Sequence, residues 1–145
     1  MADYTTTDGA RVGILMGSTS DWPTMKKASE TLEKFGVHHE CNAISAHRNP
    51  QRLQEYLADA EKRGVELFIC AAGGAAHLAG VVAAHTEKPV LGCPMQAWSL
   101  DGLDSLLQQS KCPKECQLRH SLLVEQEPSM QLHLPFKYSR WAILV

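Results

Sequence analysis

One stretch near the start of the chain most constrains the fold: an apolar run, a polar turn and the start of a helix. The run Val12–Met16 is apolar, and the turn GSTSD at residues 17–21 follows it directly. A helical pattern begins just beyond, with Pro23 in its first turn. This order predicts a buried strand, a tight turn and a helix N-terminus, as in α/β proteins.

The turn has the composition of an anion site. The first turn of a helix carries unpaired backbone N–H groups and the positive end of the helix dipole. Gly17 allows a ligand to approach the backbone, and the hydroxyl groups of residues 18–20 can donate hydrogen bonds. We predict a phosphate site here, although the turn is neither a dinucleotide fingerprint nor a lysine-containing phosphate loop. The alternative is that Ser20 or Asp21 only caps the helix.

Composition limits the class of protein. The chain has 145 residues, enough for one domain with a real core, and a net charge of −2 without a basic run, which argues against a nucleic-acid binder. No apolar stretch is long enough to span a bilayer, and the polar start at residues 1–11 lacks a signal-peptide core. We expect a cytoplasmic protein with no nucleic-acid or membrane partner.

Strand-like and helix-like segments alternate four times. The strand-like runs are Val12–Met16, Val37–Ile44, Val65–Ala72 and Pro89–Cys93. Three of the five cysteines, Cys41, Cys70 and Cys93, fall in these runs, and we read them as reduced core residues.

The helical patterns between the strands each have an apolar face. One has Met25, Ala28, Leu32 and Phe35 and ends at Gly36; the next runs from Pro50 to Gly64; a short one ends at Ala84; and the last begins near Leu100. The alternation predicts a doubly wound parallel sheet.

Three unusual loops follow strands, at residues 17–21, 45–48 and 73–77. Because ligands bind outside the carboxyl ends of parallel strands, these loops predict one shared site. His47 beside Arg48 indicates a proton carrier and an anion clamp, or else an unpartnered surface pair. His77 could equally be a structural histidine. We treat His38, His39 and His85 as surface or packing residues.

Four strings identify a family. They are GSTSDWPTM (17–25), SAHRNP (45–50), AGGAAHLAG (72–80) and PVLGCP (89–94), in order across residues 11–107. Together they resemble the bacterial-type N5-carboxyaminoimidazole ribonucleotide mutases of purine biosynthesis, the catalytic subunits of the class I phosphoribosylaminoimidazole carboxylase family. Arg48 and the GGAAH string set the chain apart from the related animal carboxylases, which tend to have lysine after the histidine. Ala79 stands where proline is usual.

The resemblance implies an octamer of three-layer flavodoxin-like subunits with no metal or organic cofactor. It also implies an isomerase reaction, in which the carboxylate leaves the exocyclic nitrogen as carbon dioxide and is reattached to the imidazole C4. His47 is then the proton carrier, Ser18 and Arg48 hold the nucleotide phosphate, and Asp21 holds the ribose. The other implied substrate-binding residues line the pocket: Gly17, Ser20, Ser45, Gly73, Gly74 and His77.

The end of the chain departs from this family. After Gly102 there is no further glycine, and after Ala97 the only alanine is Ala142. We therefore divide the chain into a mutase-like domain at 1–107, of which 1–10 is a flexible N-terminus, and a non-native tail at 108–145. The fold is then expected to lack its last native strand and helix.

A lost base explains the tail. Residues 108–114 can be written CAA CAG TCA AAA TGC CCA AAG, which encodes STVKMPK when read one base earlier. Continued through Gln131, the same frame gives STVKMPKGVPVATLAIGRAGAINA, which resembles the family's missing strand and the start of its last helix. We infer a frameshift near the codons for Leu107 and Gln108. Sequencing the gene tests this, because an intact frame there contradicts it.

The frameshift changes three expectations. Cys112, Cys116 and His120 have a spacing seen in metal sites, but we regard it as an accident of translation. We expect the tail to be poorly ordered and any helix in it fortuitous. We also expect octamer formation and activity to be impaired in the chain as written.

Two other functions stay open from the sequence. One is an aminoimidazole ribonucleotide carboxylase that uses free carbon dioxide, which Arg48 and the GGAAH loop disfavour. The other is a non-catalytic module that binds a phosphorylated ligand or FMN, for which Trp22 and Trp98 are the available aromatic platforms.

Overall fold

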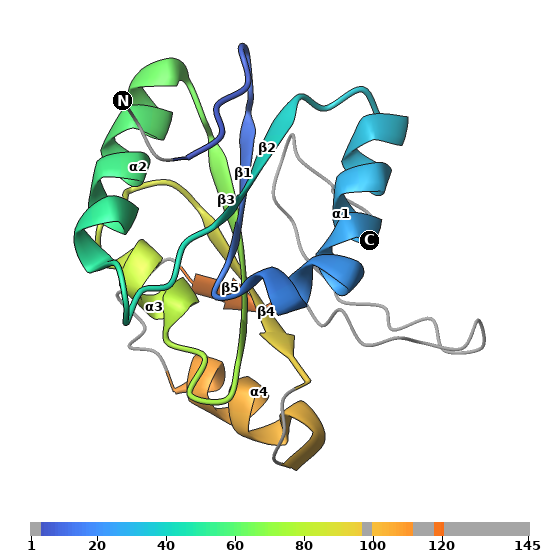
Figure 1. Ribbon diagram of the computed structural model, residues 1–145, viewed down its shortest axis with the longest axis vertical. Helices are drawn as coiled ribbons and strands as arrows, with labels where there is room; N and C mark the ends of the chain where they lie inside the picture. Colours follow the sequence, from blue (N-terminus) through green and yellow to red (C-terminus); the bar gives the residue numbers. More distant parts are fainter. Residues whose placement is uncertain (1–3, 97–99, 112–117, 121–145) are drawn as a thin grey trace.

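The computed structural model describes residues 4–96, 100–111 and 118–120, except for the side chains of residues 101 and 118–120. Within these residues, five parallel strands form one sheet in the order β2-β1-β3-β4-β5 (Figure 1). The predicted doubly wound parallel sheet is therefore confirmed. The strands are β1 (Val12–Met16), β2 (His39–Ala43), β3 (Leu67–Gly73), β4 (Val90–Met95) and β5 (Leu118–His120).

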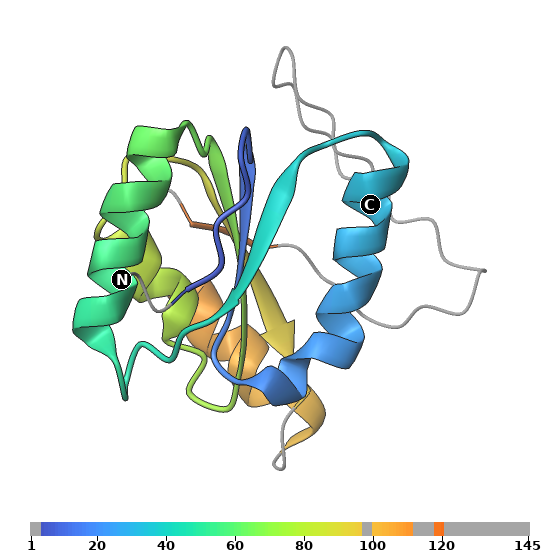
Figure 2. The same cartoon turned by 45° about the horizontal axis from the view of Figure 1, so that its top comes forward.

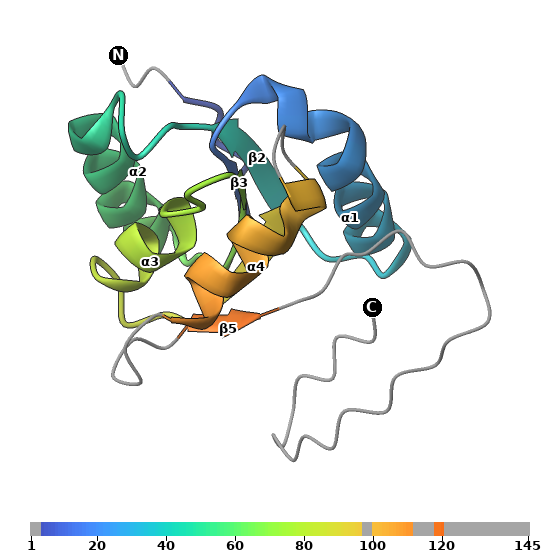
Figure 3. The same ribbon diagram turned by 90° about the horizontal axis from the view of Figure 1, so that it is seen from below.

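Helices cover both faces of the sheet, as Figure 2 shows for α1 on one side and α2 on the other. The helices are α1 (Trp22–Lys34), α2 (Pro50–Arg63), α3 (Leu78–Ala83) and α4 (Leu103–Ser110), with short 3₁₀ turns η1 (Thr19–Asp21) and η2 (Leu100–Gly102) before α1 and α4. Seen from below, α4 lies between α3 and α1, next to the ends of β3 and β4 (Figure 3).

The two apolar layers follow from the alternation of side chains along each strand. On β1, Ile14 packs with Met25 and Leu32 of α1, whereas Leu15 points the other way and packs with Leu53 and Tyr56 of α2. β3 lies in the middle of the sheet, and its central residues are all buried, as the continuous apolar run predicted. Cys70 and Cys93 are buried free thiols, and Cys41 is a partly buried one.

Phe35 is a correction to the predicted apolar face. Its side chain is 71% exposed, because α1 ends at Lys34 and Phe35 follows it as the C-terminal cap. Gly36 comes next with a φ of +67°, and this left-handed residue ends the helical path and leads the chain into β2.

The tail contributes one strand that we did not expect. Leu118–His120 pairs in parallel with Val90, Leu91 and Gly92 of β4. An edge strand offers a row of unpaired N–H and C=O groups, and backbone pairing makes few demands on side chains. The edge of β4 is therefore partly covered, while the other expectations for the tail concern residues 112–117 and 121–145, outside the described part of the chain.

Within the N-terminal segment, Tyr4, Thr5 and Thr7 make contacts to β2 and α2. The backbone of Thr5 exchanges two hydrogen bonds with the side chain of Asn42, at 2.8 and 2.9 Å. The backbone N–H of Thr7 donates to Glu40 Oε2 at 2.9 Å. The ring of Tyr4 packs edge-on against Tyr56.

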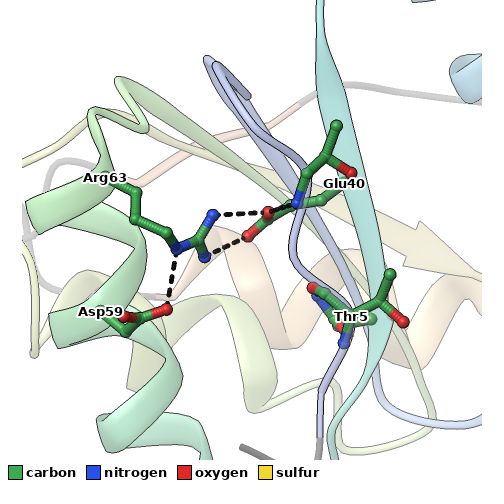
Figure 4. A network of polar contacts seen from close by, with 6 residues as sticks. Thr5, Glu40, Asp59 and Arg63 are labelled. Atoms are coloured by element: carbon green, nitrogen blue, oxygen red, sulfur yellow. Dashed lines mark hydrogen bonds and ion pairs between the residues drawn. The ribbon is translucent and has the colours of Figure 1, made fainter.

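Glu40 is the centre of this network (Figure 4). It is 2% exposed, and Arg63 of α2 donates to both its carboxylate oxygens, at 2.7 and 2.8 Å. Arg63 Nε also donates to Asp59 at 2.8 Å. Burial alone raises the pKa of Glu40, but hydrogen bonds from Arg63 and Thr7 outweigh it and leave that pKa below its ordinary value.

The lowered pKa of Glu40 predicts acid sensitivity. The charged carboxylate stabilises the fold above the ordinary carboxyl pKa, and this stabilisation is lost as the pH falls through the lowered value. We expect Glu40→Gln to reduce the free energy of unfolding by about 2 kcal/mol at pH 7 and to flatten its decline at acidic pH. Urea titrations from pH 7 downward measure this. Glu66→Gln, which breaks the exposed pair with Arg11, is the control and should change little.

Gly13 gives a second stability prediction. A Cβ at this position would lie 2.7 Å from Tyr56 Oη and 2.9 Å from the Phe68 ring. We expect Gly13→Ala to reduce the free energy of unfolding, measured by urea denaturation, by about 1–3 kcal/mol, because the buried aromatic rings must shift. Gly17→Ala is a matched control in the same segment, since a Cβ there meets nothing closer than 3.9 Å. Equal effects of the two substitutions would contradict the packing argument.

Candidate active site

A cavity of about 260 Å³ opens at the carboxyl edge of the sheet. It lies where the strand order reverses, between the loops that follow β1 and β3, as expected for a doubly wound sheet. The predicted site residues that line it come from three loops: Gly17, Ser18, Ser20, Asp21, Ser45, His47, Gly73 and His77. Arg48 and Gly74 are not among the lining residues, and Gly74 borders a neighbouring groove beside α4.

The first loop is fixed by a capping box. Ser18 is the N-cap of η1, and its hydroxyl accepts from the Ser20 N–H at 3.2 Å. The Asp21 carboxylate accepts from the Ser18 N–H at 3.2 Å. Ser18 therefore caps η1, whereas Asp21 occupies the N-cap position of α1 without a capping hydrogen bond from its side chain. The exposed Ser20 hydroxyl, 2.9 Å from Ser18 Oγ, remains on the cavity wall.

Partial burial disfavours the charged form of Asp21 on the cavity wall. Burial raises the pKa of its carboxyl group, and the hydrogen bond from Ser18 only partly opposes this. A carboxylate held in this state gains from donors that a ligand could bring, such as ribose hydroxyls.

His47 and His77 form a hydrogen-bonded pair. His47 Nε2 lies 2.8 Å from His77 Nδ1, and the two rings meet edge to face. The residues come from the loops after β2 and β3, so the sheet brings them together across 30 positions of sequence. One nitrogen must donate and the other accept, so at least one of the two rings is neutral while the bond exists.

Arg48 lies beside the first loop. Its Nη2 atom donates to the Gly17 carbonyl at 3.4 Å, and its backbone N–H donates to Ser45 Oγ at 3.4 Å. Both contacts are long, and the guanidinium group keeps further donors for an anion next to Ser18.

The remaining wall contains residues that were not among the predicted substrate-binding residues. They are Ala46, Ala72, Ala76, Leu78 and Gln96. Gln96 is the polar one and directly follows β4, so the rule that strand ends carry the site could have found it. The small apolar side chains of Ala46, Ala72 and Ala76 line the cavity together with the two histidines.

Metal and membrane roles receive no structural support. In residues 4–96 and 100–111, no group of three or more histidine, cysteine or acidic side chains is arranged to hold a metal ion. Cys112 and Cys116 lie outside the described residues. No described helix combines the length and apolar character needed to cross a bilayer.

A family model described as AIR carboxylase matches residues 11–122. The chain belongs to the AIR carboxylase family. Its match to the family model therefore continues past Leu107, where we placed the end of the resemblance.

Within the AIR carboxylase family, the chain is similar to proteins named N5-carboxyaminoimidazole ribonucleotide mutase. The one from Vibrio parahaemolyticus serotype O3:K6 is 54% identical over 104 residues, which are 72% of this chain and 65% of that protein. The one from Pyrococcus abyssi is 55% identical over 103 residues, 71% of this chain and 59% of that protein. This chain thus spans less than two thirds of the length of these curated relatives.

The fold is also that of a solved family member. The crystal structure of Treponema denticola PurE superposes with a TM-score of 0.71 and 28% identity, over 77% of this chain and 70% of that one.

The raised pKa of Asp21 predicts a conflict between stability and binding. A raised carboxyl pKa means that the fold loses stability as the pH rises through the folded-state value. We expect Asp21→Asn, which keeps an acceptor for the Ser18 N–H, to raise the melting temperature at pH 7 and to leave it unchanged at acidic pH. The same variant should bind ribose 5-phosphate more weakly than the parent chain. A lower melting temperature at pH 7 would contradict the assigned cause.

Proposed function

We propose that the cavity binds N5-carboxyaminoimidazole ribonucleotide and converts it to 4-carboxyaminoimidazole ribonucleotide, in purine biosynthesis. The observation that carries the proposal is the hydrogen-bonded pair of His47 and His77, in a cavity that is also lined by small residues and by Ser18 and Asp21. The similarity to mutases over 104 residues supports the same reaction.

The nucleotide is expected to lie along the cavity. Its phosphate binds the hydroxyl groups of Ser18 and Ser20 and the guanidinium of Arg48, while Asp21 accepts from the ribose hydroxyls. Gly17 leaves room for close approach to the backbone, because even a Cβ there would have no contact below 3.9 Å. The aminoimidazole ring then reaches Ser45, Gly73 and the two histidines.

His47 carries one proton through the reaction. Protonation of the carbamate nitrogen breaks the N–C bond and releases carbon dioxide and aminoimidazole ribonucleotide. The imidazole C4 attacks the trapped carbon dioxide, and His47 then removes the C4 proton, so the proton it lost returns and the atoms balance. The hydrogen bond between His47 Nε2 and His77 Nδ1 orients the His47 ring for both transfers.

The small residues of the cavity wall help to retain the released carbon dioxide. Ala72, Gly73 and Ala76 line the cavity together with the histidines, and Ala72 and Ala76 are buried, so this part of the wall offers no polar side chain. Carbon dioxide held there meets C4 before it diffuses away, which is an effect of proximity.

Assembly and compartment are part of the same proposal. We propose a cytoplasmic enzyme that forms a homo-octamer when its native C-terminal segment is present and needs no cofactor. The frameshift replaces that segment after Leu107, so we expect the chain as written to assemble and turn over less well. The match of 104 residues to the Vibrio parahaemolyticus mutase supports this boundary, since it leaves about a third of that relative unmatched.

Substrate dependence separates this proposal from its alternatives. A mutase forms product from N5-carboxyaminoimidazole ribonucleotide alone, whereas a carboxylase needs aminoimidazole ribonucleotide with bicarbonate. An FMN module would bind flavin with an aromatic contact, but Trp22 does not line the cavity, and Trp98 lies outside the described residues.

We expect His47→Asn to lower kcat by about 10²–10⁴-fold, because it removes the proton carrier. Affinity for the product should change little, as measured by calorimetry. The assay is product formation by the frame-restored chain and its variants. His38→Asn is the matched control, since His38 is exposed and outside the cavity, and it should keep full activity. Full activity of the His47 variant would contradict the assigned role.

A further inference from the structure

Ser105 of α4 carries a buried hydroxyl group that lies outside the cavity and contacts the ends of two strands whose following residues line it. The residue is 0% exposed. Its Oγ donates to the Met95 carbonyl at 3.0 Å and lies 3.4 Å from the Gly74 carbonyl. Met95 ends β4, and Gly74 follows the last residue of β3. One hydroxyl hydrogen is therefore shared between the ends of two neighbouring strands.

The loop that Ser105 reaches is strained. Gly74 has a φ of +62°, and Ala76, which lines the cavity, has a φ of +45°. A left-handed conformation at a residue with a Cβ costs about 1–2 kcal/mol and persists only where the surroundings impose it. Within the loop, the Ala76 N–H donates to the Gly73 carbonyl at 3.2 Å, which closes the turn but does not fix its position on the sheet.

The start of α4 lies close to the backbone at the end of β4, and a glycine makes this approach possible. Gly102 adopts a φ of +86° at the start of α4, and a Cβ there would lie 3.2 Å from Gln96 Cα and 3.4 Å from the Met95 carbonyl oxygen. This glycine lets the helix come close enough for Ser105 to reach Met95. Gln96, the next residue, lies on the cavity wall.

We propose that Ser105 is a positioning residue that clamps together two segments of the cavity wall, the loop after β3 and the residue that follows β4. Through Gly74 it fixes the loop that ends in His77, and through Met95 it fixes the start of the segment that carries Gln96. It makes no contact with the phosphate end, which Ser18 and Asp21 build by their own capping box. Which part of the cavity binds the phosphate and which binds the reacting ring rests on the proposed function. The contacts of Ser105 do not depend on that function.

The first test needs no ligand. Hydrogen exchange of the full chain, as written, should show that Ser105→Ala accelerates exchange of the Ala76 amide by at least about fivefold relative to the amide of Ile69 in β3. The matched control is Ser110→Ala, which removes a hydrogen bond from the same helix to the Leu107 carbonyl. It should leave Ala76 unchanged. The clamp would be overturned if exchange of the Ala76 amide were not accelerated, or if it were accelerated only as much as exchange of the Ile69 amide.

The second test distinguishes the two ends of the cavity. Ser105→Ala should weaken binding of 4-carboxyaminoimidazole ribonucleotide by about five- to tenfold and leave binding of ribose 5-phosphate within twofold. A variant that is simply less folded loses both affinities in proportion, and that result would overturn the positioning role. If the parent chain binds neither compound, the proposed function fails, and the clamp is then decided by the exchange measurement.

Discussion

The register of the parallel strands is the constraint on which the rest of the structure depends. Met16, the last residue of β1, pairs with Ala43 of β2 and Ala71 of β3. Each of these strands therefore ends at nearly the same level, and the three loops with polar residues leave the sheet side by side. A shift of one residue would turn every core side chain of a strand to the opposite face, so the apolar core and the site are fixed together.

Two partly or fully buried carboxylates have opposite effects on stability: the charge of Glu40 is stabilised by its partners, whereas the charge of Asp21 is disfavoured. The buried carboxylate of Glu40 is matched by Arg63 and by the backbone of Thr7, which ties the N-terminal segment and α2 to β2. Asp21 in the cavity has the opposite balance, because burial disfavours its charge and one backbone hydrogen bond does not compensate. Functional sites are commonly where such unfavourable ionisation is retained.

Much of the fold could be predicted from local pattern. The continuous apolar run around Cys70 marked the central strand, and the positions of Pro50 and Gly64 marked the limits of α2. Phe35 was wrongly assigned to the apolar face of α1, because the spacing of apolar residues continues one residue beyond Lys34, where the helix ends. Pairing of the tail with β4 was not predictable, since it depends on an available edge and not on the side chains of Leu118–His120.

The site was predictable where the signal lay in adjacent residues and less so where it depended on tertiary contact. The string containing His47 and Arg48 stood out beside a strand end, and so did the glycine-rich loop before His77. The contact of 2.8 Å between the two histidines arises from the packing of segments distant in sequence. The cap supplied by Ser18 is local, but its pairing within residues 18–21 was not predicted. Gln96 carried no sequence signal except its place directly after β4. Their catalytic roles stay predictions.

Transfer of a labelled carboxylate tests the proposed reaction most directly. N5-carboxyaminoimidazole ribonucleotide carrying ¹³C in its carboxylate would be given to the frame-restored chain and, in parallel, to the chain as written, in a buffer with excess unlabelled bicarbonate. We predict product labelled at the C4 carboxylate with the frame-restored chain and markedly less product with the chain as written. Unlabelled product formed from bicarbonate would contradict the mutase mechanism, and no product from a folded frame-restored chain would contradict the function itself.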